Sequence, residues 1–420
     1  MIKHVLKMIW NQRKSNSWIF AELLIVLGAL WVMTDVLVAN LAVYSMPLGY
    51  DVRDCYNLQF SRLSTKSTEY VTDSLTNDAE DIQRILTNLR QNQKVENVCL
   101  HFLAHSYSPG YWWTTMYHAE ADSTEKNDYY YRHSVVSPEY FEVLRIQDKS
   151  GKPIRQQLSS DLAQLVITPD IEDKFYPERS AVGQRLKHSI DDSETFPVTA
   201  VCSSIRSNEY VKSEPFFYRV QSGSVMSDFI NNGRGERMTC IIRMRPGFKA
   251  DEIEKFLEDM GDRLASNNMY VSGVNSMDME RTYALKGYTD AIKKKLALVM
   301  FMLVNVFFGV VGSFWLRIQY RRGELGLRTA LGSTRRGLLG FLNLEGTGLL
   351  VLTLPFILIF ILNMLYFDIP DTANLPYTWW RFGIALGLAL LLLSGMILIG
   401  VWFPARKVMK MNPAEALHYE

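Results

Sequence analysis

The sequence lacks the short motifs that mark the common nucleotide-binding and hydrolytic enzymes. Its 420 residues contain no G-x-x-x-x-G-K-[ST] loop, which excludes ATP binding in the P-loop manner. They contain no H-E-x-x-H and no G-x-S-x-G motif either. No other arrangement of a nucleophile beside a base is recognisable. We therefore expect neither a catalytic centre nor a bound cofactor on this chain.

The chain also lacks a large net charge of either sign. Lysine and arginine together number 45 and aspartate and glutamate 44, so the formal net charge is +1. A chain this close to neutral has no overall field that would attract nucleic acid. Its basic residues instead gather beside apolar runs, where membrane orientation and lipid headgroups account for them. We expect membrane lipid, and no nucleic acid, among its partners.

Cysteine is scarce, and Cys55, Cys99, Cys202 and Cys240 all fall within residues 45–292. Their wide spacings fit no zinc motif. If this segment lies outside the cytoplasm, disulfides are permitted there. Buried free thiols are the alternative, and the sequence does not decide between the two.

A histidine pair follows one of these cysteines. Cys99, His101 and His105 share one face of either a strand or a helix. Such a group has ligands that suit a metal ion, but histidine pairs at this spacing also arise by chance. We expect no metal site.

Four long apolar runs are present, and each exceeds the roughly 20 residues needed to cross a hydrocarbon core. The segments beside them, 1–16, 317–337 and 404–420, are basic and therefore cytoplasmic by the positive-inside rule. This places residues 45–292 and the short acidic loop 368–381 outside. The predicted transmembrane helices, one N-terminal and three C-terminal, are residues 17–44, 293–316, 338–367 and 382–403.

Two acidic residues, Glu22 and Asp35, lie inside the first predicted span, where ionisable groups are costly. Their separation places them on nearly opposite faces of a helix, so we do not expect them to form one ion site. We expect buried hydrogen bonds between helices rather than a proton or ion relay.

The outer segment, 45–292, is predicted to be a large α+β domain in which a strand-helix-strand pattern occurs twice. In each copy, apolar residues at helical spacing lie between short β-like runs. The first copy covers residues 52–103 and the second 237–274. A helix from about residue 283 leads from this domain into the second span.

Two such halves predict a split βαβ lobe formed by residues 45–129 and 237–282. The intervening segment, 130–236, is rich in short β-like runs separated by polar turns. We expect it to form an inserted, β-rich lobe. The predicted fold class is therefore an α+β membrane protein with four transmembrane helices.

The outer segment contains an unusually aromatic stretch. Aromatic side chains bury much area at little cost in conformational entropy, which favours them at protein interfaces. They also pack the core of a domain, and both interpretations remain open here. The candidate residues for contact with a substrate or an adaptor are Tyr107, Tyr111, Trp112, Trp113 and Tyr117.

The polar connector between the second and third spans carries the sharpest pattern in the chain. If it is helical, Arg321 and Arg328 fall on one side. Gly332 would end this helix, and Ser333 and Thr334 would begin the next. A short amphipathic helix of this kind seats in a partner's groove or lies among lipid headgroups, and the pattern alone favours neither. Another side of the helix carries Tyr320, Gly323, Leu327, Ala330 and Leu331.

The connector resembles the signature of a known family, the MacB/FtsX-type permease subunits of ABC transporters. Residues 322–333 read R-G-E-L-G-L-R-T-A-L-G-S, which is similar to the family pattern R-x-E-[IL]-G-[IL]-R-x-A-[LM]-G-[AS]. The tail, with N-P-A-E-A-L at 412–417, resembles the family ending, although His418 stands where a basic residue is usual. Segments 134–144 and 166–186 are similar to parts of the family's periplasmic core domain.

The resemblance implies a subunit of the cytoplasmic (inner) membrane with both termini in the cytoplasm. Two such chains, identical or different, would pair through their first and second spans. Each would dock a separate ATPase subunit that holds ATP and Mg, and would transmit its motion to the periplasmic domain for export, efflux or envelope extrusion. A periplasmic adaptor and an outer-membrane channel would be further partners. The residues implied in ATPase coupling are Arg322, Glu324, Leu325, Leu327, Arg328, Leu331 and Gly332.

Two other functions compete with this one. An FtsX-like regulator would bind and activate a periplasmic cell-wall hydrolase or sense a peptide, although peptide-sensing members typically carry more than four spans. A membrane-anchored enzyme would not need three C-terminal spans. Copurification of an ATPase subunit would distinguish the transporter from both.

Overall fold

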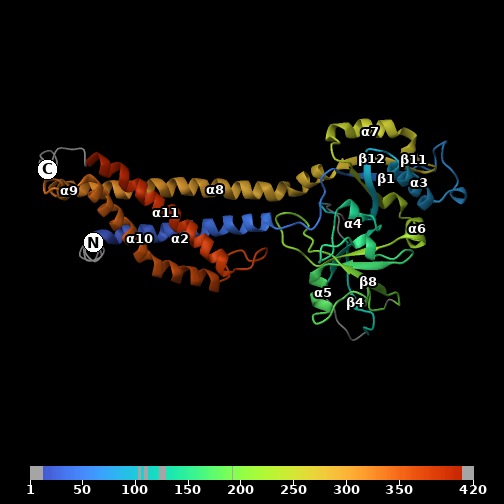
Figure 1. Ribbon diagram of the computed structural model, residues 1–420, viewed down its shortest axis with the longest axis horizontal. Helices are drawn as coiled ribbons and strands as arrows, with labels where there is room; N and C mark the ends of the chain where they lie inside the picture. Colours follow the sequence, from blue (N-terminus) through green and yellow to red (C-terminus); the bar gives the residue numbers. More distant parts are fainter. Residues whose placement is uncertain (1–12, 103–105, 108–111, 123–128, 192, 409–420) are drawn as a thin grey trace. The chain divides into compact units, whose positions relative to one another are not determined.

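The structure is a computed structural model that divides into two compact units, Met1–Ser45 with Thr289–Glu420 and Met46–Tyr288 (Figure 1). We call the first the membrane unit and the second the outer domain, and describe each by itself. The residues that the structure describes are 13–102, 106–107, 112–122, 129–191 and 193–408.

Within these residues, four helices are long and apolar enough to cross a membrane. They are arranged as predicted, with one near the N-terminus and three in the C-terminal part of the chain. A fifth, short helix, α9 (Arg322–Ala330), occupies the connector between the second and third. The four long helices are α2 (Arg13–Ser45), α8 (Met277–Tyr320), α10 (Arg335–Tyr366) and α11 (Trp379–Val408).

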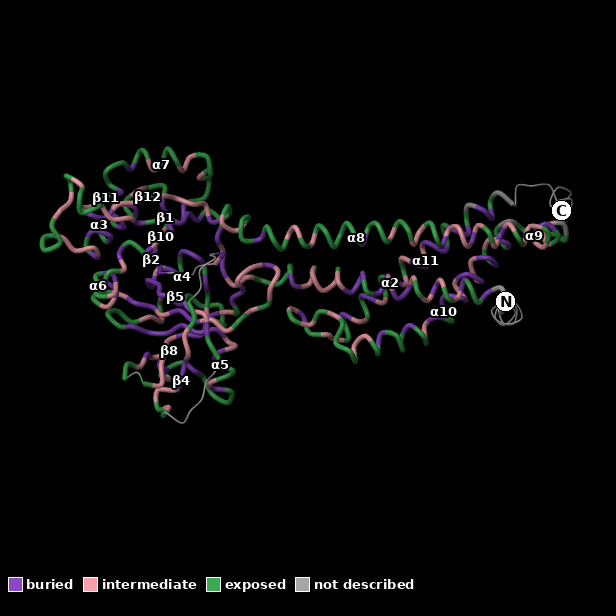
Figure 2. Tube along the Cα trace, turned by 180° about the vertical axis from the view of Figure 1, so that it is seen from behind, coloured by how far each residue is buried: buried purple, intermediate pink, exposed green. Residues whose placement is uncertain are grey.

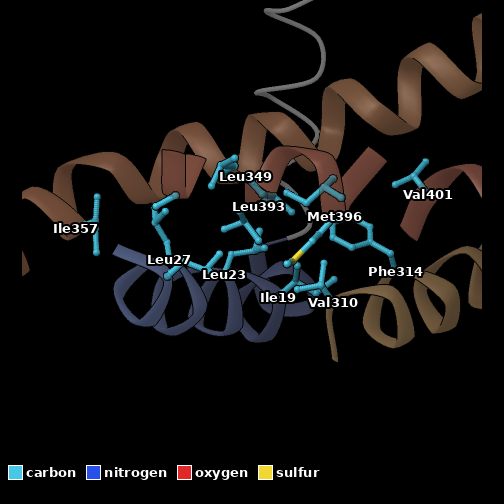
Figure 3. Packing of buried hydrophobic residues seen from close by; sticks show 14 of the residues in the cluster. Ile19, Leu23, Leu27, Val310, Phe314, Leu349, Ile357, Leu393, Met396 and Val401 are labelled. Carbon is cyan, nitrogen blue, oxygen red and sulfur yellow. The ribbon is translucent and has the colours of Figure 1, made fainter. Parts of the chain in front are cut away.

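The membrane unit has a continuous apolar core to which all four long helices contribute. Figure 3 shows Leu23 and Leu27 of α2 beside Leu349 of α10 and Leu393 of α11. Phe314 of α8 joins the same cluster. Because apolar side chains from all four helices are in contact here, direct packing between the helices stabilises the unit.

Of the four long helices, α8 has the smallest buried share, 11% of its most apolar window against 44%, 28% and 39% for α2, α10 and α11, and Figure 2 shows exposed residues along much of it. Phe301 and Phe308 are 66% and 67% exposed. Val299 and Val310, on the opposite face of the same stretch, are buried in the apolar core, so α8 is covered on one side here and exposed on the other. This surface of α8 is therefore available to lipid or to another protein chain.

The outer domain is built on one path of paired strands, ordered β11-β12-β1-β10-β2-β5-β9-β6-β8-β7-β4, with β3 paired to β5. Its strands are β1 (Cys55–Arg62), β2 (Val95–Phe102), β3 (Trp112–Thr114), β4 (Tyr117–His118), β5 (Tyr131–Val136), β6 (Gln164–Ile167), β7 (Arg185–Lys187), β8 (Phe196–Val201), β9 (Phe216–Val220), β10 (Met238–Met244), β11 (Ala265–Ser266) and β12 (Met269–Ser276). Its α-helices are α3 (Asp78–Arg90), α4 (Tyr140–Val143), α5 (Pro169–Phe175), α6 (Gly223–Asn231) and α7 (Ile253–Met260), besides the first turns of α8.

Strands β12, β1, β10 and β2 lie side by side, each antiparallel to its neighbour. Helix α3 connects β1 to β2, and α7 lies between β10 and β12 in the chain. Strand β2 then pairs with β5 through His101–Val136 and Phe102–Val135. The strands of segment 130–236 therefore continue the same path of paired strands.

Helix α3 shows why these residues adopt this structure. Asn77 caps its N-terminus, since the Oδ1 atom accepts the N–H groups of Ala79 and Glu80 at 3.0 and 3.2 Å. Its apolar residues recur every three or four positions and are all buried against the sheet. These buried residues are Ala79, Ile82, Ile85, Leu86 and Leu89.

All four cysteines are buried free thiols, so the second of the two alternatives left open by the sequence is the one observed. His101 is also buried, and its Nε2 lies 2.7 Å from Thr239 Oγ1. His105 lies outside the described residues. Among the residues that are described, no group of three or more potential metal ligands occurs.

Two histidines packed on an aromatic ring make the outer domain sensitive to acid. The rings of His133 and His188 lie 5.0 and 5.3 Å from that of Phe217. Burial lowers the pKa of His133 to about 4 and that of His188 to about 3. Because both values lie below the usual 6.5 or so, protonation favours the unfolded chain, and stability is lost as the pH falls from about 6.5 toward 4.

We expect acidification from pH 7 to 5 to cost about 1 to 2 kcal/mol per histidine, seen as a fall in the thermal midpoint. The His133→Phe variant should lose less stability over the same interval. An identical fall in the variant and the parent chain would contradict the assignment.

Candidate functional site

Helix α9 has a defined end on its C-terminal side. Gly332 adopts a φ of +92°, its N–H donates to Thr329 O at 3.1 Å, and the N–H of Ser333 donates to Arg328 O at 3.0 Å. This pair of bonds is the Schellman motif, which glycine permits because it tolerates positive φ. Thr334 then caps α10 by accepting the N–H of Gly337 at 3.2 Å. The predicted stop at Gly332 and the new cap after it are both confirmed.

The charged side of α9 is connected to α8 and α10 by a series of ion pairs in which arginines and glutamates alternate. Glu345 of α10 is 2% exposed and accepts from Arg317 of α8 and from Arg321, the latter at 2.6 Å. Arg321 also donates to Glu324 at 2.9 and 3.0 Å. Arg328 donates to the same carboxylate at 2.9 Å. We call these five residues the arginine–glutamate network.

The network explains the protonation state of Glu324. Its pKa lies below the usual value chiefly because the carboxylate accepts hydrogen bonds from Arg321, with Arg328 adding to the effect and partial burial opposing it. The carboxylate therefore stays charged over the physiological range, and the pairs that hold α9 stay intact.

The apolar side of α9 faces away from the chain. Leu327 within α9 is 51% exposed, and the residues that flank the helix, Leu331 at its C-cap and Tyr320 at the end of α8, are 79% and 88% exposed. Leu325 is the exception, since it is 1% exposed and belongs to the core of the membrane unit. The usual amphipathic arrangement is thus inverted: charges pair inward, and large apolar side chains point outward. Exposed apolar surface of this kind marks a binding site for a protein or a lipid.

The structure distributes the other predicted coupling residues along the same segment. Arg322 begins α9 and is half-buried, while Gly332 is exposed in the turn. The sequence did not single out Glu345 or Arg317, although an ionisable residue at either end of an apolar run is the signal that points to them. They are the residues that fix the orientation of α9.

The aromatic stretch of the outer domain divides into a buried and an exposed part. Tyr107 and Tyr117 are buried, whereas Trp112 and Trp113 on β3 are 51% and 55% exposed. Tyr111 lies outside the described residues. The guanidinium of Arg132 lies 5.8 Å from the ring of Trp113. Of the candidate contact residues that are described, only the two tryptophans offer their rings to a partner.

Tyr107 belongs to a polar cluster at the beginning of the outer domain, where the chain continues from the end of α2. Glu209 accepts from Tyr107 at 3.1 Å and from Arg281 in the first turns of α8 at 2.6 Å. Arg206 donates to the carbonyl oxygens of Met46 and Glu209 at 2.7 and 2.6 Å. These bonds link the residue after α2 to the start of α8. No sequence pattern indicated this junction, because its members lie far apart in the chain.

Both acidic residues of the first span make bonds between helices, as predicted. Glu22 accepts from Ser313 of α8 at 2.6 Å. Asp35 forms a two-point ion pair with Arg381 of α11 at 2.7 and 2.9 Å, and both side chains are buried. Arg381 was not singled out from the sequence.

No protein-family model matches the chain, and no curated protein sequence matches it. Among solved structures, a domain assigned to a permease protein from Porphyromonas gingivalis is 14% identical, with 56% of this chain and 99% of that chain covered and a TM-score of 0.34. The periplasmic region of MacB from Actinobacillus actinomycetemcomitans is 10% identical, with 58% and 97% covered and a TM-score of 0.33.

The extracellular domain of the noncanonic ABC-type transporter YknZ from Gram-positive bacteria is 9% identical, with 52% and 100% covered and a TM-score of 0.27. The three are thus a permease, MacB and an ABC-type transporter, the class that the connector signature resembles.

Proposed function

We propose that this chain is the membrane subunit of an ABC-type transporter and docks a separate ATPase subunit on helix α9. The inverted arrangement of α9 carries the proposal. Leu327, Leu331 and Tyr320 form an outward apolar surface, and the arginine–glutamate network holds that surface in one orientation. A fixed apolar helix face fits a groove in a protein better than a fluid lipid surface, which needs no fixed orientation.

A displacement of the docked ATPase would be transmitted from α9 to α8 through the ion pairs between them. The network joins α9 to Arg317 near the end of α8, and α8 continues without interruption over 44 residues. Its first turns are bonded through Arg281 to Glu209 of the outer domain. In this proposal the chain transmits force and performs no catalysis, and ATP and Mg are held by the partner.

The exposed apolar face of α8 is proposed to receive a second membrane subunit, identical or different. Phe301 and Phe308 are seven residues apart and therefore share one face of α8, and this face offers apolar area to a second helix. The two chains would then bring two α9 helices to two ATPase subunits in the cytoplasm, with the outer domains in the periplasm.

A second candidate function is favoured by Trp112 and Trp113. An exposed tryptophan pair beside an arginine has the composition of an interaction hot spot. In an exporter it would contact a periplasmic adaptor that leads to an outer-membrane channel. In an FtsX-like regulator it would contact a cell-wall hydrolase.

The test is purification of the tagged full chain from its native membrane in mild detergent, with mass identification of the proteins that accompany it. We expect an ATPase subunit with a P-loop, and an adaptor or a hydrolase would distinguish export from regulation. The Leu327→Arg variant should recover at least about tenfold less ATPase, because it places a charge in the centre of the apolar face.

The matched control is Leu75→Arg, since Leu75 is an exposed leucine of the outer domain, 78% exposed. It should recover ATPase at the parental level. Equal recovery with Leu327→Arg and Leu75→Arg, or the absence of any ATPase from the parent preparation, would refute docking on α9.

A further inference from the structure

Three consecutive lysines lie at the end of the α8 span that is nearer in the chain to the outer domain. Lys293, Lys294 and Lys295 come directly before the apolar run that begins at Leu296, and all three side chains are exposed. They belong to the membrane unit. Basic residues at this end oppose the positive-inside rule, because the connector at the other end of α8 is the segment expected in the cytoplasm. Membrane orientation therefore does not account for these lysines.

The part of the chain that the structure describes supplies no counter-charge to the three lysines. None of their ammonium groups has a carboxylate within 4.0 Å, although Asp290 lies one turn earlier on the same helix. At the other end of α8, by contrast, Arg317 is paired with Glu345. Successive residues of an α-helix are about 100° apart around its axis, so the three charges cover about 200° of the helix at one level. Like charges this close repel each other, and an anion from outside the chain would stabilise them.

Exposed aromatic residues mark the membrane boundary on the same side. Tyr366 ends α10 and Trp379 begins α11, and they are 83% and 89% exposed. Because the connector joins α8 to α10, the start of the α8 span and the end of α10 lie on the same side of the membrane. Aromatic rings concentrate where the hydrocarbon core meets the lipid headgroups. The lysines are thus expected at the level of the headgroups and not in bulk water.

Apolar side chains continue the face of Lys293 into the membrane. Met300 and Val304 follow it by about two and three turns of the helix, so they lie on its side of α8. They are 54% and 50% exposed. A cation at the boundary with exposed apolar side chains beyond it has the same order as a phospholipid, whose charged headgroup precedes its acyl chains. This face adjoins the one with Phe301 and Phe308, so a lipid and a second subunit do not compete for the same side chains.

We propose that Lys293, Lys294 and Lys295 bind the headgroups of anionic phospholipids in the leaflet next to the outer domain. Their ammonium groups donate to phosphate oxygens, and an acyl chain lies along Met300 and Val304. A zwitterionic phospholipid brings the same phosphate with a compensating amine, so it binds more weakly. An acidic segment of another protein is the competing occupant. The proposal does not depend on ATPase docking, since the lysines and α9 lie at opposite ends of α8.

The test incubates the purified full chain in mixed micelles with equal amounts of phosphatidylglycerol and phosphatidylcholine that carry the same acyl chains. Native mass spectrometry then counts the lipids that remain bound to each chain. We expect the parent chain to retain at least about tenfold more phosphatidylglycerol than phosphatidylcholine. An excess of inorganic phosphate should not displace the phosphatidylglycerol, because free phosphate has no acyl chains. Basic residues at the cytoplasmic end also contribute to this ratio, so the assignment depends on comparing variants.

Three triple variants assign the contacts. Replacing all three lysines with glutamine should lower the bound phosphatidylglycerol at least about threefold and leave phosphatidylcholine unchanged. Replacing all three with arginine keeps the charge and should retain the parental amount. The matched control removes the same charge from exposed lysines of the outer domain and should bind like the parent; it combines Lys66→Gln, Lys94→Gln and Lys152→Gln.

Equal amounts of phosphatidylglycerol on the parent and on the glutamine variant would overturn the proposal. An equal loss of both lipids, an equal loss in the control, or displacement by inorganic phosphate would overturn it as well. So would a protein that copurifies from the native membrane with the parent but not with the glutamine variant, while the bound lipid stays unchanged. ATPase recovery should remain parental in all three variants, so a failure of docking on α9 is distinguishable from a failure here.

Discussion

Replacing Asp35 with leucine is expected to destabilise the membrane unit by about 3–5 kcal/mol, because it leaves the buried guanidinium of Arg381 without its carboxylate. The cost arises from the unpaired charge and not from the loss of a favourable contact as such. The measurement is the thermal midpoint of the purified chain in detergent, with and without the substitution.

The double variant Asp35→Leu with Arg381→Leu should recover part of that loss, since neither charge then remains buried. Recovery should be incomplete, because Arg381 also donates to the carbonyl oxygens of Asp371 and Leu375. The control is Glu80→Leu, which removes an exposed ion pair and should cost no more than about 1 kcal/mol. A double variant less stable than Asp35→Leu alone would contradict this account.

Replacing Glu345 with leucine is expected to have a comparable effect on stability and a larger one on function. It leaves both Arg317 and Arg321 without the carboxylate that they share in a mostly buried position. We expect a loss of about 3 kcal/mol or more in the membrane unit. Since Arg321 and Glu324 then lose their anchor on α10, α9 should no longer hold one orientation, and ATPase recovery should fall.

The matched comparison is Glu324→Gln, which interrupts the same network where it is partly exposed. Its cost in stability should stay within about 1 kcal/mol. ATPase recovery should decrease less than in Glu345→Leu. If Glu345→Leu recovered ATPase at the parental level with a lowered thermal midpoint, the network would be structural only.

Much of the organisation of this chain follows from the sequence. Runs of about 20 apolar residues have few alternatives to a membrane span, so four spans and their order could be predicted. The end of α9 was equally accessible, because a glycine followed by a capping hydroxyl residue is a local signal. The amphipathic spacing of α3 likewise predicted which of its residues are buried.

The tertiary structure decided the features that depend on distant partners. Asp35 and Arg381 are far apart in the chain, and nothing local to either indicates the other. The spacing of the connector showed two different sides of a helix but not which side faces the protein. Glu345 reverses the usual expectation, because a buried carboxylate on α10 draws the arginines inward and leaves Leu327 and Leu331 exposed.

The aromatic stretch illustrates the same limit. Tyrosine and tryptophan have similar statistical preferences, so the sequence could not separate Tyr107 and Tyr117, which are buried, from Trp112 and Trp113, which are exposed. A cavity of about 690 Å³ in the outer domain was not foreseeable at all, since it exists only where α3 and α6 meet the sheet. Local sequence determines which elements form, whereas ion pairs, exposed faces and cavities arise from contacts between elements that only the folded chain brings together.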